Sequence, residues 1–350
     1  MWKVIGQEKA VHLLKRSLEK DAFAHAFIFS GPPHVGKMTL AMDMARALNC
    51  EASDSPCGEC SNCRRIIQGK HADVQVINLE NGVENDETRK ATEISIKRIR
   101  QLQHSASLPP FEGKYKVFII EEAELLSTEA ANCLLKTLEE PEERIVFILL
   151  TGNTEMLLQT VVSRCQKLAL SPMPAEDIAV ELKNTHAVEA KKAKLLSRLC
   201  YGCIGWAISV ALDDKIIEQY FEDRQSILEI TKSSCEERFA YAEKLARQFS
   251  QKRKDTQRIL ELWLDIWRDL LLVKSGSASE IINIDIEEEI NEMVEGYNLG
   301  DIRRFIGGIQ AADTQLKNNT NPRLVLEVLM LDIPGKIKER VESQVSYGRE

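Results

Sequence analysis

Four cysteines gather within one short stretch of the chain: Cys50, Cys57, Cys60 and Cys63. Four thiolates complete the tetrahedral shell that zinc prefers, and the two C-x-x-C steps bring the backbone round one ion. Because four cysteine ligands leave no open position for water, such a zinc would be structural rather than catalytic. Disulfides would need an exported protein, and residues 1–8 contain no hydrophobic signal core. We therefore expect a structural Zn²⁺ module at 50–63.

A glycine-rich loop lies just upstream of the cysteines. The apolar run at 27–29 predicts a buried strand, and Gly31-Pro32-Pro33-His34-Val35-Gly36-Lys37-Met38 follows it. This segment matches the phosphate loop G-x-x-x-x-G-K-[ST] except at the last position. The backbone around Gly31 and Gly36 would surround phosphate oxygens, with Lys37 on the outer phosphates. Met38 lacks the hydroxyl that normally holds Mg²⁺, and Thr39 is turned about 100° away. The sequence thus predicts a phosphate loop with a weakened metal seat.

Two adjacent carboxylates follow a second apolar run. Residues 117–120 predict a core strand, and Glu121-Glu122 comes directly after it. In a nucleotide site the usual pair is Asp-Glu, in which the Asp lies behind Mg²⁺ and the Glu positions the attacking water. Glu121 is one methylene longer than Asp, whereas Glu122 keeps the position of the base. The alternative is that the pair only begins a solvated loop. The phosphate loop upstream favours the nucleotide interpretation.

The elements that would position these residues alternate regularly. Apolar strands and amphipathic helices succeed one another over residues 1–170, which is typical of a parallel sheet covered on both faces. The expected strands are 27–29, 74–77, 117–120, 146–150 and 167–170. The proline-containing segment 171–174 ends this run, and from residue 175 the periodicity is helical. In the helical part, Trp263 and Trp267 share one helical face, which predicts core packing, with an interface role as the alternative.

Composition limits the class of protein. The chain has 350 residues, of which 44% are hydrophobic and 29% charged, as in folded proteins of two or three domains. No run approaches the ~18–20 apolar residues that cross a bilayer. The net charge of −8 argues against a chain-wide grip on DNA phosphates, and we expect the basic cluster at 97–100 to be a solvated helix face. Nine cysteines without an export signal indicate a reducing compartment, so we expect a cytoplasmic location.

Two further motifs make the pattern specific. One is Asn132-Cys133-Leu134-Leu135-Lys136-Thr137-Leu138-Glu139-Glu140-Pro141, and the other is Ser163-Arg164-Cys165. Smaller matches are Val4-Ile5-Gly6-Gln7, His71-Ala72-Asp73 and Ile99-Arg100. With these motifs the chain resembles the bacterial clamp-loader subunits of DNA polymerase III, which are AAA+ proteins. The family patterns are N-x-L-L-K-x-L-E-E-P and S-R-C, with a four-cysteine zinc module after the phosphate-loop helix. The resemblance is strong over 1–210 and mostly architectural beyond.

The family contains a tau/gamma motor branch and a delta-prime branch, and four departures favour the second. Met38 and Glu121 are two of them. In addition, 151–153 lacks a second Thr that senses phosphate in the motor subunit, and Gly205 stands where that subunit has an Arg facing the nucleotide. The resemblance therefore implies little or no ATP hydrolysis, a vestigial base at Glu122, and ATP/Mg²⁺ that binds weakly or not at all. The alternative is an active tau/gamma-like ATPase motor.

Arg164 of the S-R-C motif is kept although the phosphate site departs from the family pattern. The resemblance implies that it reaches across an interface into the ATP of a neighbouring subunit. Such an arginine finger stabilises charge on the γ-phosphate in the transition state and contributes about 10³–10⁵ in rate. The alternative is a surface arginine that caps the end of a helix.

The resemblance also implies an architecture and a set of partners. The fold class would be an α/β AAA+ phosphate-loop domain with a zinc insert at 1–170, a small helical lid at 171–212 and an all-α collar at 213–350. The collar would join five subunits into a hetero-pentamer. The partners would be the tau/gamma and delta subunits, the sliding clamp and, through the complex, primed DNA. The chain would belong to the polymerase holoenzyme without polymerising nucleotides itself, and it would not contact a membrane.

Two other features have competing interpretations. A zinc-containing nucleic-acid-binding module is a distant alternative function, because the basic residues near the cysteines are offset by acidic ones. These are Arg64, Arg65 and Lys70 against Glu51, Asp54 and Glu59. Separately, Cys200 and Cys203 have the C-x-x-C spacing of redox dithiols. They lie in a helical segment rather than after the first strand of a thioredoxin-like unit, so we expect them to pack in the lid.

Overall fold

The computed structural model describes the chain apart from residues 21–22, 80–92, 319 and 336–350. It divides into two compact units. The first is formed by 1–178 with 200–206, and the second by 179–199 with 207–350. The domain boundaries expected at 170 and 212 stay predictions, and the end of the predicted collar, 336–350, lies outside the described residues.

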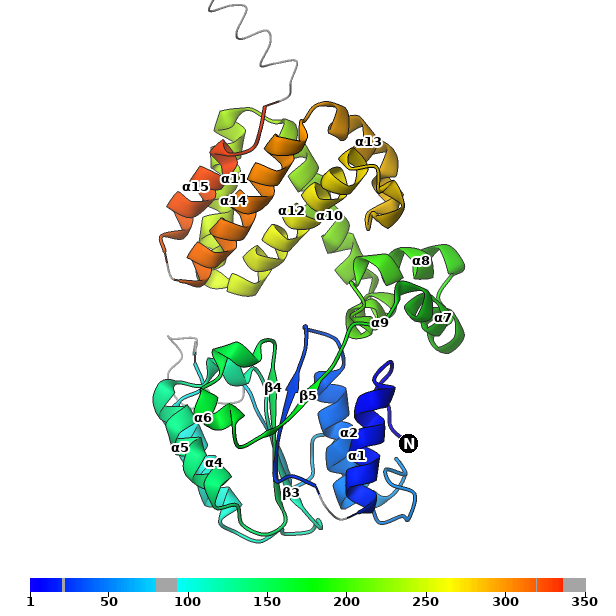
Figure 1. The fold of residues 1–350 in the computed structure, drawn as a ribbon, viewed down its shortest axis with the longest axis vertical. Helices are drawn as coiled ribbons and strands as arrows, with labels where there is room; N and C mark the ends of the chain where they lie inside the picture. The colour runs from blue at the N-terminus through cyan, green and yellow to red at the C-terminus, as the bar shows by residue number, and fades with distance from the viewer. Residues whose placement is uncertain (21–22, 80–92, 319, 336–350) are drawn as a thin grey trace, which may run out of the picture. The chain divides into compact units, whose positions relative to one another are not determined.

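The first unit is built on one five-stranded sheet (Figure 1). The strands are β1 (Ala26–Ser30), β2 (Val74–Ile77), β3 (Lys116–Ile120), β4 (Ile145–Thr151) and β5 (Gln166–Ala169). Their order across the sheet is β2-β3-β4-β1-β5, and every neighbouring pair is parallel. Each apolar run that was expected to form a strand does so. Parallel sheets are buried on both faces, which explains why β3 and β4 are buried along their whole length.

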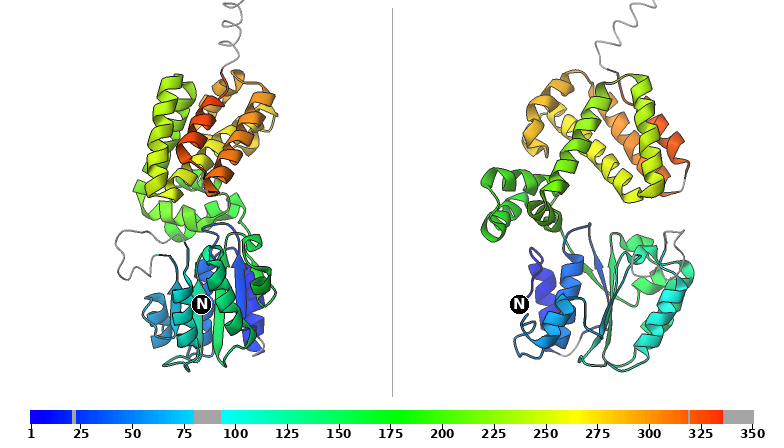
Figure 2. Two further views of the ribbon diagram at one scale, coloured as in Figure 1. Left: turned by 90° about the vertical axis from the view of Figure 1, so that its left-hand side faces the viewer. Right: turned by 180° about the vertical axis from the view of Figure 1, so that it is seen from behind.

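Helices cover both faces of this sheet (Figures 1 and 2). One face carries α1 (Glu8–Glu19) and α2 (Lys37–Asn49), and the other carries α4 (Ile96–Ala106), α5 (Thr128–Glu139) and α6 (Gln159–Val162). Alternate strand residues enter the two cores, so that Phe27 packs with α1 and α2 whereas Ile28 packs with α4 and α5. A short helix, α3 (Ser61–Ile67), follows the cysteine segment. The expected α/β fold class, a parallel sheet with helices on both faces, is confirmed.

The described part of the second unit is helical. It contains α8 (Ala190–Leu199), α10 (Asp214–Lys232), α11 (Cys235–Gln251), α12 (Arg253–Lys274), α13 (Glu287–Glu295), α14 (Leu299–Lys317) and α15 (Pro322–Leu331). Two more helices, α7 (Ala175–His186) and α9 (Ile204–Leu212), are shared with the first unit. Trp263 and Trp267 of α12 are fully buried against Phe305 of α14, which confirms core packing. Among the described residues, no helix is long and apolar enough to cross a membrane.

A buried carboxylate holds the loop that leads into β3. Asp73 belongs to the His71-Ala72-Asp73 motif and is fully buried. Its two oxygens accept the backbone N–H groups of Phe111, Glu112 and Gly113 at 2.7–2.8 Å. Burial alone would raise the pKa of the Asp73 carboxyl, but the hydrogen bonds from these three donors lower it by more. The pKa of Asp73 therefore lies below its ordinary value. The motif thus fixes a loop whose next residues contact the cysteine segment.

We expect Asp73→Asn to lower the free energy of unfolding by about 2–4 kcal/mol at pH 7, because hydrogen bonds to a charged acceptor are lost. The native pKa of Asp73 is depressed, so its stabilisation is present above about pH 4 and is lost as the pH falls through the native pKa. The gap between wild type and variant should therefore narrow on acidification, as measured by urea unfolding at several pH values. The exposed Asp177→Asn should change stability by about 0.5 kcal/mol or less. An equal effect of the two substitutions would contradict the assignment.

Candidate functional site

The phosphate loop connects β1 to α2 at the carboxyl ends of the strands, where parallel sheets bind their ligands. The N–H of Gly31 donates to the carbonyl of Thr151 at the end of β4, at 3.3 Å. Gly36 has a φ of +105°, a left-handed conformation that favours glycine, and α2 starts at the next residue. No side chain caps this helix, so its first N–H groups stay open towards the loop. The backbone therefore has the form of an anion cradle.

The lysine of the loop contacts its own backbone. Lys37 Nζ donates to the carbonyl oxygens of Gly31 at 2.6 Å and Pro32 at 2.8 Å. Partial burial lowers the pKa of Lys37, and the nearby carboxylates, with Glu124 the largest contributor, oppose this shift. Phosphate oxygens would have to displace two short contacts within the loop in order to reach the ammonium group. The ammonium group of Lys37 is thus hydrogen-bonded to the backbone of its own loop.

Three carboxylates follow β3 near Lys37, and the sequence pattern indicated only two of them. Glu121 accepts a hydrogen bond from Asn78 Nδ2 at 3.5 Å. Glu124 Oε1 accepts the N–H of Gly152, just after β4, at 3.0 Å, and its Oε2 is buried without a hydrogen bond. Glu124 escaped prediction because it comes two residues after Glu122 and belongs to no motif. A third carboxylate beside Lys37 makes the site less favourable for a polyanion.

Met38 and Thr39 stand in the first turn of α2, where the phosphate-loop pattern has the hydroxyl that holds Mg²⁺. The side chain of Met38 packs against the apolar cluster between the sheet and α1–α2. Thr39, one residue later, is exposed. Position 38 therefore supplies no hydroxyl to a magnesium ion, and position 39 lies on another side of the helix.

The segment 200–206 contacts the apex of the phosphate loop within the first unit. Gly205 donates its N–H to the carbonyl of His34 at 3.0 Å. A Cβ built on Gly205 would lie 2.7 Å from that same oxygen, closer than real Cβ atoms come. Position 205 therefore has no room for a side chain in this arrangement. The absence of an arginine at this position stays an expectation from the resemblance, whereas the contact with His34 joins residues that are remote in the chain and carried no sequence signal.

The four cysteines of the insert converge as the spacing predicts. Among the described residues, the Sγ atoms of Cys50, Cys57, Cys60 and Cys63 all lie within 4.8 Å of one another. Four sulfurs at about 2.3 Å from a zinc ion are about 3.8 Å apart in a tetrahedron, and Cys57 Sγ lies 4.0 Å from Cys63 Sγ. The donor set and its dimensions therefore fit Zn²⁺.

Backbone N–H groups point at the sulfurs. Cys57 Sγ accepts from Glu59 at 3.4 Å and from Cys60 at 3.3 Å, and these donors lower the pKa of Cys57 to about 6. Cys60 Sγ accepts the N–H of Cys63 and thereby caps α3. Burial acts in the opposite direction and raises the pKa of Cys63. Without a cation the cluster would thus hold a mixture of thiol and thiolate, whereas a zinc ion would stabilise all four thiolates.

Arg164 lies at the end of the sheet where β1 and β5 begin, opposite the end that carries the phosphate loop. Its Nη1 donates to the carbonyl of Thr160 in α6 at 2.9 Å, and its Nη2 contacts Glu139 at the end of α5 at 2.5 Å. The side chain stays about one-third exposed. Arg164 comes two residues before β5, whose first residue pairs with Phe27 near the amino end of β1. The phosphate loop follows the carboxyl end of β1, so the length of a strand separates Arg164 from it.

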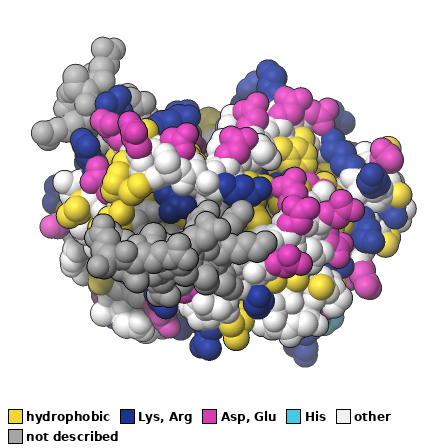
Figure 3. All heavy atoms as spheres, turned by 90° about the horizontal axis from the view of Figure 1, so that it is seen from above, with side chains coloured by type: hydrophobic (Ala, Val, Ile, Leu, Met, Phe, Trp, Pro, Cys, Tyr) yellow, Lys and Arg dark blue, Asp and Glu magenta, His cyan; other side chains and the backbone are white. Residues whose placement is uncertain are grey.

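The remaining candidates carry less chemistry. Cys200 and Cys203 are both buried, and burial raises the pKa of Cys200 to about 11, so its thiol is protonated at neutral pH. Arg98 of the 97–100 cluster donates to the carbonyls of Asn78 and Leu79 instead of facing solvent freely. Figure 3 shows one face of the molecule, on which Lys and Arg lie intermixed with Asp and Glu. Neither the Cys200–Cys203 pair nor the 97–100 cluster was assigned a catalytic, nucleotide-binding or metal-binding role from the sequence.

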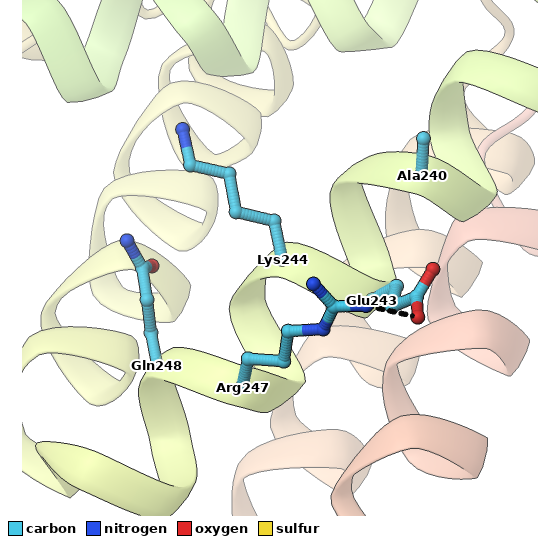
Figure 4. Close-up of a pocket in the computed structure, with 5 residues that line it drawn as sticks. All are labelled: Ala240, Glu243, Lys244, Arg247 and Gln248. Carbon is cyan, nitrogen blue, oxygen red and sulfur yellow. Dashed lines mark hydrogen bonds and ion pairs between the residues drawn. The ribbon is translucent and has the colours of Figure 1, made fainter.

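An open pocket of about 270 Å³ lies along α11 (Figure 4). Its lining residues are Ala240, Glu243, Lys244, Arg247 and Gln248. The guanidinium of Arg247 turns to Glu243 at 2.8 Å, so part of its charge is compensated. All lining residues come from one helix, and we assign no chemistry to this pocket.

Sequence comparison relates the chain to subunits of DNA polymerase III. The family described as "DNA polymerase III, delta subunit" matches residues 6–174. Subunit delta' of Bacillus subtilis is 27% identical and covers 94% of this chain, which spans 97% of that protein. Subunit tau of the same organism is also 27% identical over 94% of this chain, which spans only 60% of tau. A solved DNA polymerase III gamma subunit-related protein of Thermotoga maritima aligns with 93% of this chain and 98% of its own, at 16% identity and a TM-score of 0.44.

The contact between Gly205 and His34 predicts an unusual response to alanine. Gly→Ala in a helix normally stabilises it by about 0.5–1 kcal/mol, and Gly307→Ala in α14 should do so, because a Cβ there meets no atom within 4 Å. Gly205→Ala should instead destabilise by about 1–3 kcal/mol, because the Cβ meets the carbonyl of His34. Chemical unfolding of both variants measures the two signs. Stabilisation by both substitutions would show that the loop and the helix are not packed this closely.

Proposed function

We propose that the chain, which matches DNA polymerase III subunits of the delta-prime and tau/gamma kind, acts as a delta-prime-like subunit of the replicative clamp loader. In this role it supports ATP-dependent loading of the sliding clamp on primed DNA. It supplies an arginine to the ATP site of a neighbouring subunit and hydrolyses little or no ATP itself. Its partners are the tau/gamma and delta subunits in a hetero-pentamer.

The position of Arg164 is the observation that carries this proposal. An arginine at the amino edge of the sheet does not reach a phosphate group held at the carboxyl edge of the same sheet, about four residues or ~13 Å further along the strands. Its guanidinium is nevertheless partly exposed and held in place by Thr160 and Glu139. This combination suits an arginine that acts on the nucleotide of another subunit. The contact with the Thr160 carbonyl also agrees with a helix cap, so the experiment below separates the two roles.

Weak catalysis by the chain itself follows from the state of the phosphate loop. Lys37 is bonded to the loop, Met38 supplies no hydroxyl and Glu124 adds negative charge. Arginine at position 205 would clash with His34. Each of these features makes the binding free energy of Mg²⁺ and of the terminal phosphates less favourable. Hydrolysis depends on both, because the transition-state charge develops at the terminal phosphate. Glu122 would then be a base without a substrate in position.

We also propose that Cys50, Cys57, Cys60 and Cys63 hold a structural Zn²⁺. When it is bound, the ion closes the insert by tetrathiolate coordination and contributes folding energy locally. The four cysteines would all be ligands, so this zinc would not take part in catalysis. The insert follows α2 and precedes β2 at the edge of the sheet, which has its own apolar strands.

The second candidate function is an active tau/gamma-like motor. The retained Gly36, Lys37 and Glu122 favour it, because the anion cradle and the position of the base are both present. It requires the loop to release Lys37 and to separate from residues 200–206 when nucleotide enters. The two candidates therefore differ in one measurable property of the isolated chain, which is its ATPase rate.

We expect the purified chain to hydrolyse ATP at a rate well below about 1 s⁻¹, the lower end for competent enzymes, because the metal seat is incomplete. Steady-state phosphate release with excess Mg²⁺ measures this rate, and Lys37→Ala is the control for contaminating ATPases. A fluorescent ATP analogue with and without Mg²⁺ measures binding separately. A rate above about 1 s⁻¹ that disappears in Lys37→Ala would establish the motor instead.

Arg164→Ala should leave the fold and assembly of the reconstituted complex unchanged and lower its rate of clamp loading in a single turnover. The reason is that one neighbouring ATP site loses the charge that stabilises its transition state. Arg164→Lys should rescue the rate only in part, because an ammonium group lacks the planar fork that contacts two phosphate oxygens. Steady-state ATPase should fall less than loading, since the other sites keep their arginines.

The control for Arg164 is Arg16→Ala, which removes an exposed arginine from the last turn of α1. This variant should load clamps at the wild-type rate. Unchanged loading and unchanged ATPase in the Arg164→Ala complex would mean that Arg164 only caps α6. Loss of complex assembly, in contrast, would assign it a structural role at the interface.

A further inference from the structure

A charged pair is buried inside α2, next to the cysteine insert. Asp43 and Arg46 are each 1% exposed and form an ion pair within the helix. Asp43 Oδ2 also accepts the backbone N–H groups of Lys3 and Val4, at 2.5 Å and 2.9 Å. Its carboxylate is therefore satisfied on one side by the N-terminal segment and on the other by Arg46. These hydrogen bonds and the ion pair compensate for the loss of hydration of the buried Asp43 carboxylate.

The same contacts do not account for Arg46. Its Nη2 bonds to Asp43, but its Nη1 is buried and makes no hydrogen bond with the described residues. A buried donor without an acceptor costs about 1–3 kcal/mol, and more when the group is charged. Arginine usually avoids this state, because its guanidinium carries five donors and cannot lose its proton. Among the described residues, Arg46 Nη1 thus has no hydrogen-bond acceptor, and an anionic group beside it would compensate for its burial.

The free nitrogen faces the turn that carries the cysteine ligands. A Cβ built on Gly58 would lie 3.9 Å from Arg46 Nη1. Gly58 stands between Cys57 and Cys60 in the sequence. Arg46 Nη1 therefore lies beside the turn that joins these two cysteines. The carboxylate of Asp43 faces the N-terminal segment, so the positive end of the pair is directed at the cluster.

Zinc bound by four thiolates carries a net charge of −2. Two of its ligands, Cys50 and Cys63, are almost fully buried, so water offsets this charge poorly on that side. We propose that Arg46 is the buried counter-cation of the zinc–thiolate cluster, which it stabilises through its free Nη1. This inference rests on the proposal that the four cysteines bind zinc. Outer groups of this kind typically change metal affinity 10–100-fold.

A second cation near the cluster provides a comparison. Lys114 Nζ donates to the carbonyl of Cys50 at 2.7 Å, but Lys114 is exposed. Water and salt screen its charge, so its effect on the metal should be small. Lys114 thus resembles Arg46 in charge and in closeness to a ligand residue, and differs from it in burial. That difference makes Lys114→Met a matched control.

The test uses the full chain, purified under reducing conditions without chelator. Zinc content is measured first, and zinc release to a chromogenic chelator is then followed over time. Asp43→Asn keeps the guanidinium and should release zinc no faster than wild type. The double variant Asp43→Asn with Arg46→Met removes both charges, so it leaves no unpaired carboxylate, and it should release zinc about 10–100-fold faster. Lys114→Met should stay within about twofold of wild type.

Two further measurements separate a role at the metal from a role in the fold. Arg46→Lys keeps the charge and most of the stem but loses the nitrogen at Gly58, and it should release zinc about 10-fold faster with unchanged circular dichroism. In the Co²⁺-substituted protein, loss of the cation should move the thiolate-to-metal absorption to longer wavelength, since the sulfur lone pairs rise in energy. A purely structural role of Arg46 would leave this band in place.

The outcomes distinguish zinc binding by the four cysteines from the role of Arg46. Wild-type protein that contains no zinc would overturn the zinc proposal itself. A second outcome would overturn the assignment of Arg46 and leave the zinc proposal in place. In this outcome each chain holds one zinc, the double variant releases it within twofold of the rate of Asp43→Asn, and Arg46→Lys releases it within twofold of the wild-type rate. Faster release in both variants, with the shift in the cobalt spectrum, supports the counter-cation.

Discussion

The parallel pairing of β1 with β4 on one side and β5 on the other is the constraint on which the site depends. It brings the phosphate loop, the residues after β4 and the acidic residues after β3 to one edge of the sheet. It also directs the segment before β5, with Arg164, to the opposite edge. A single register therefore creates two chemically different edges on one domain.

Buried carboxylates that accept main-chain N–H groups recur through both units. Asp73 holds the loop before β3, Asp43 holds the N-terminal segment, and Asp269 of α12 accepts the N–H groups of Ile282 and Asn283 at 2.9–3.1 Å. In each case the backbone N–H groups of an irregular segment, which has no pairing partner of its own, donate to a buried carboxylate, which lies in a helix for Asp43 and Asp269 and in the turn before β2 for Asp73. Two such carboxylates, Asp43 and Asp73, fix irregular segments of the unit that contains the cysteine insert.

Much of the fold could be predicted from the sequence, because each strand is a short apolar run between turn signals and the four cysteines are close in the chain. The missing parts are contacts between residues far apart, such as Glu124 with Gly152 and Gly205 with His34. Helical periodicity also failed to indicate Arg46. A polar residue in an amphipathic helix is assigned to solvent, but nearly all of α2 after Thr39 is buried, its charges included.

The hydrogen bond between Gly205 and His34 has a consequence for the residues that position 205 can accept. A side chain at position 205 does not fit while the loop apex occupies its present place, since even a methyl group collides with the carbonyl of His34. The apex of the loop, which Lys37 joins through the carbonyls of Gly31 and Pro32, would have to move first. The identity of one helical residue is therefore coupled to the conformation of the phosphate loop, so that the size of the side chain at position 205 sets where the loop can lie.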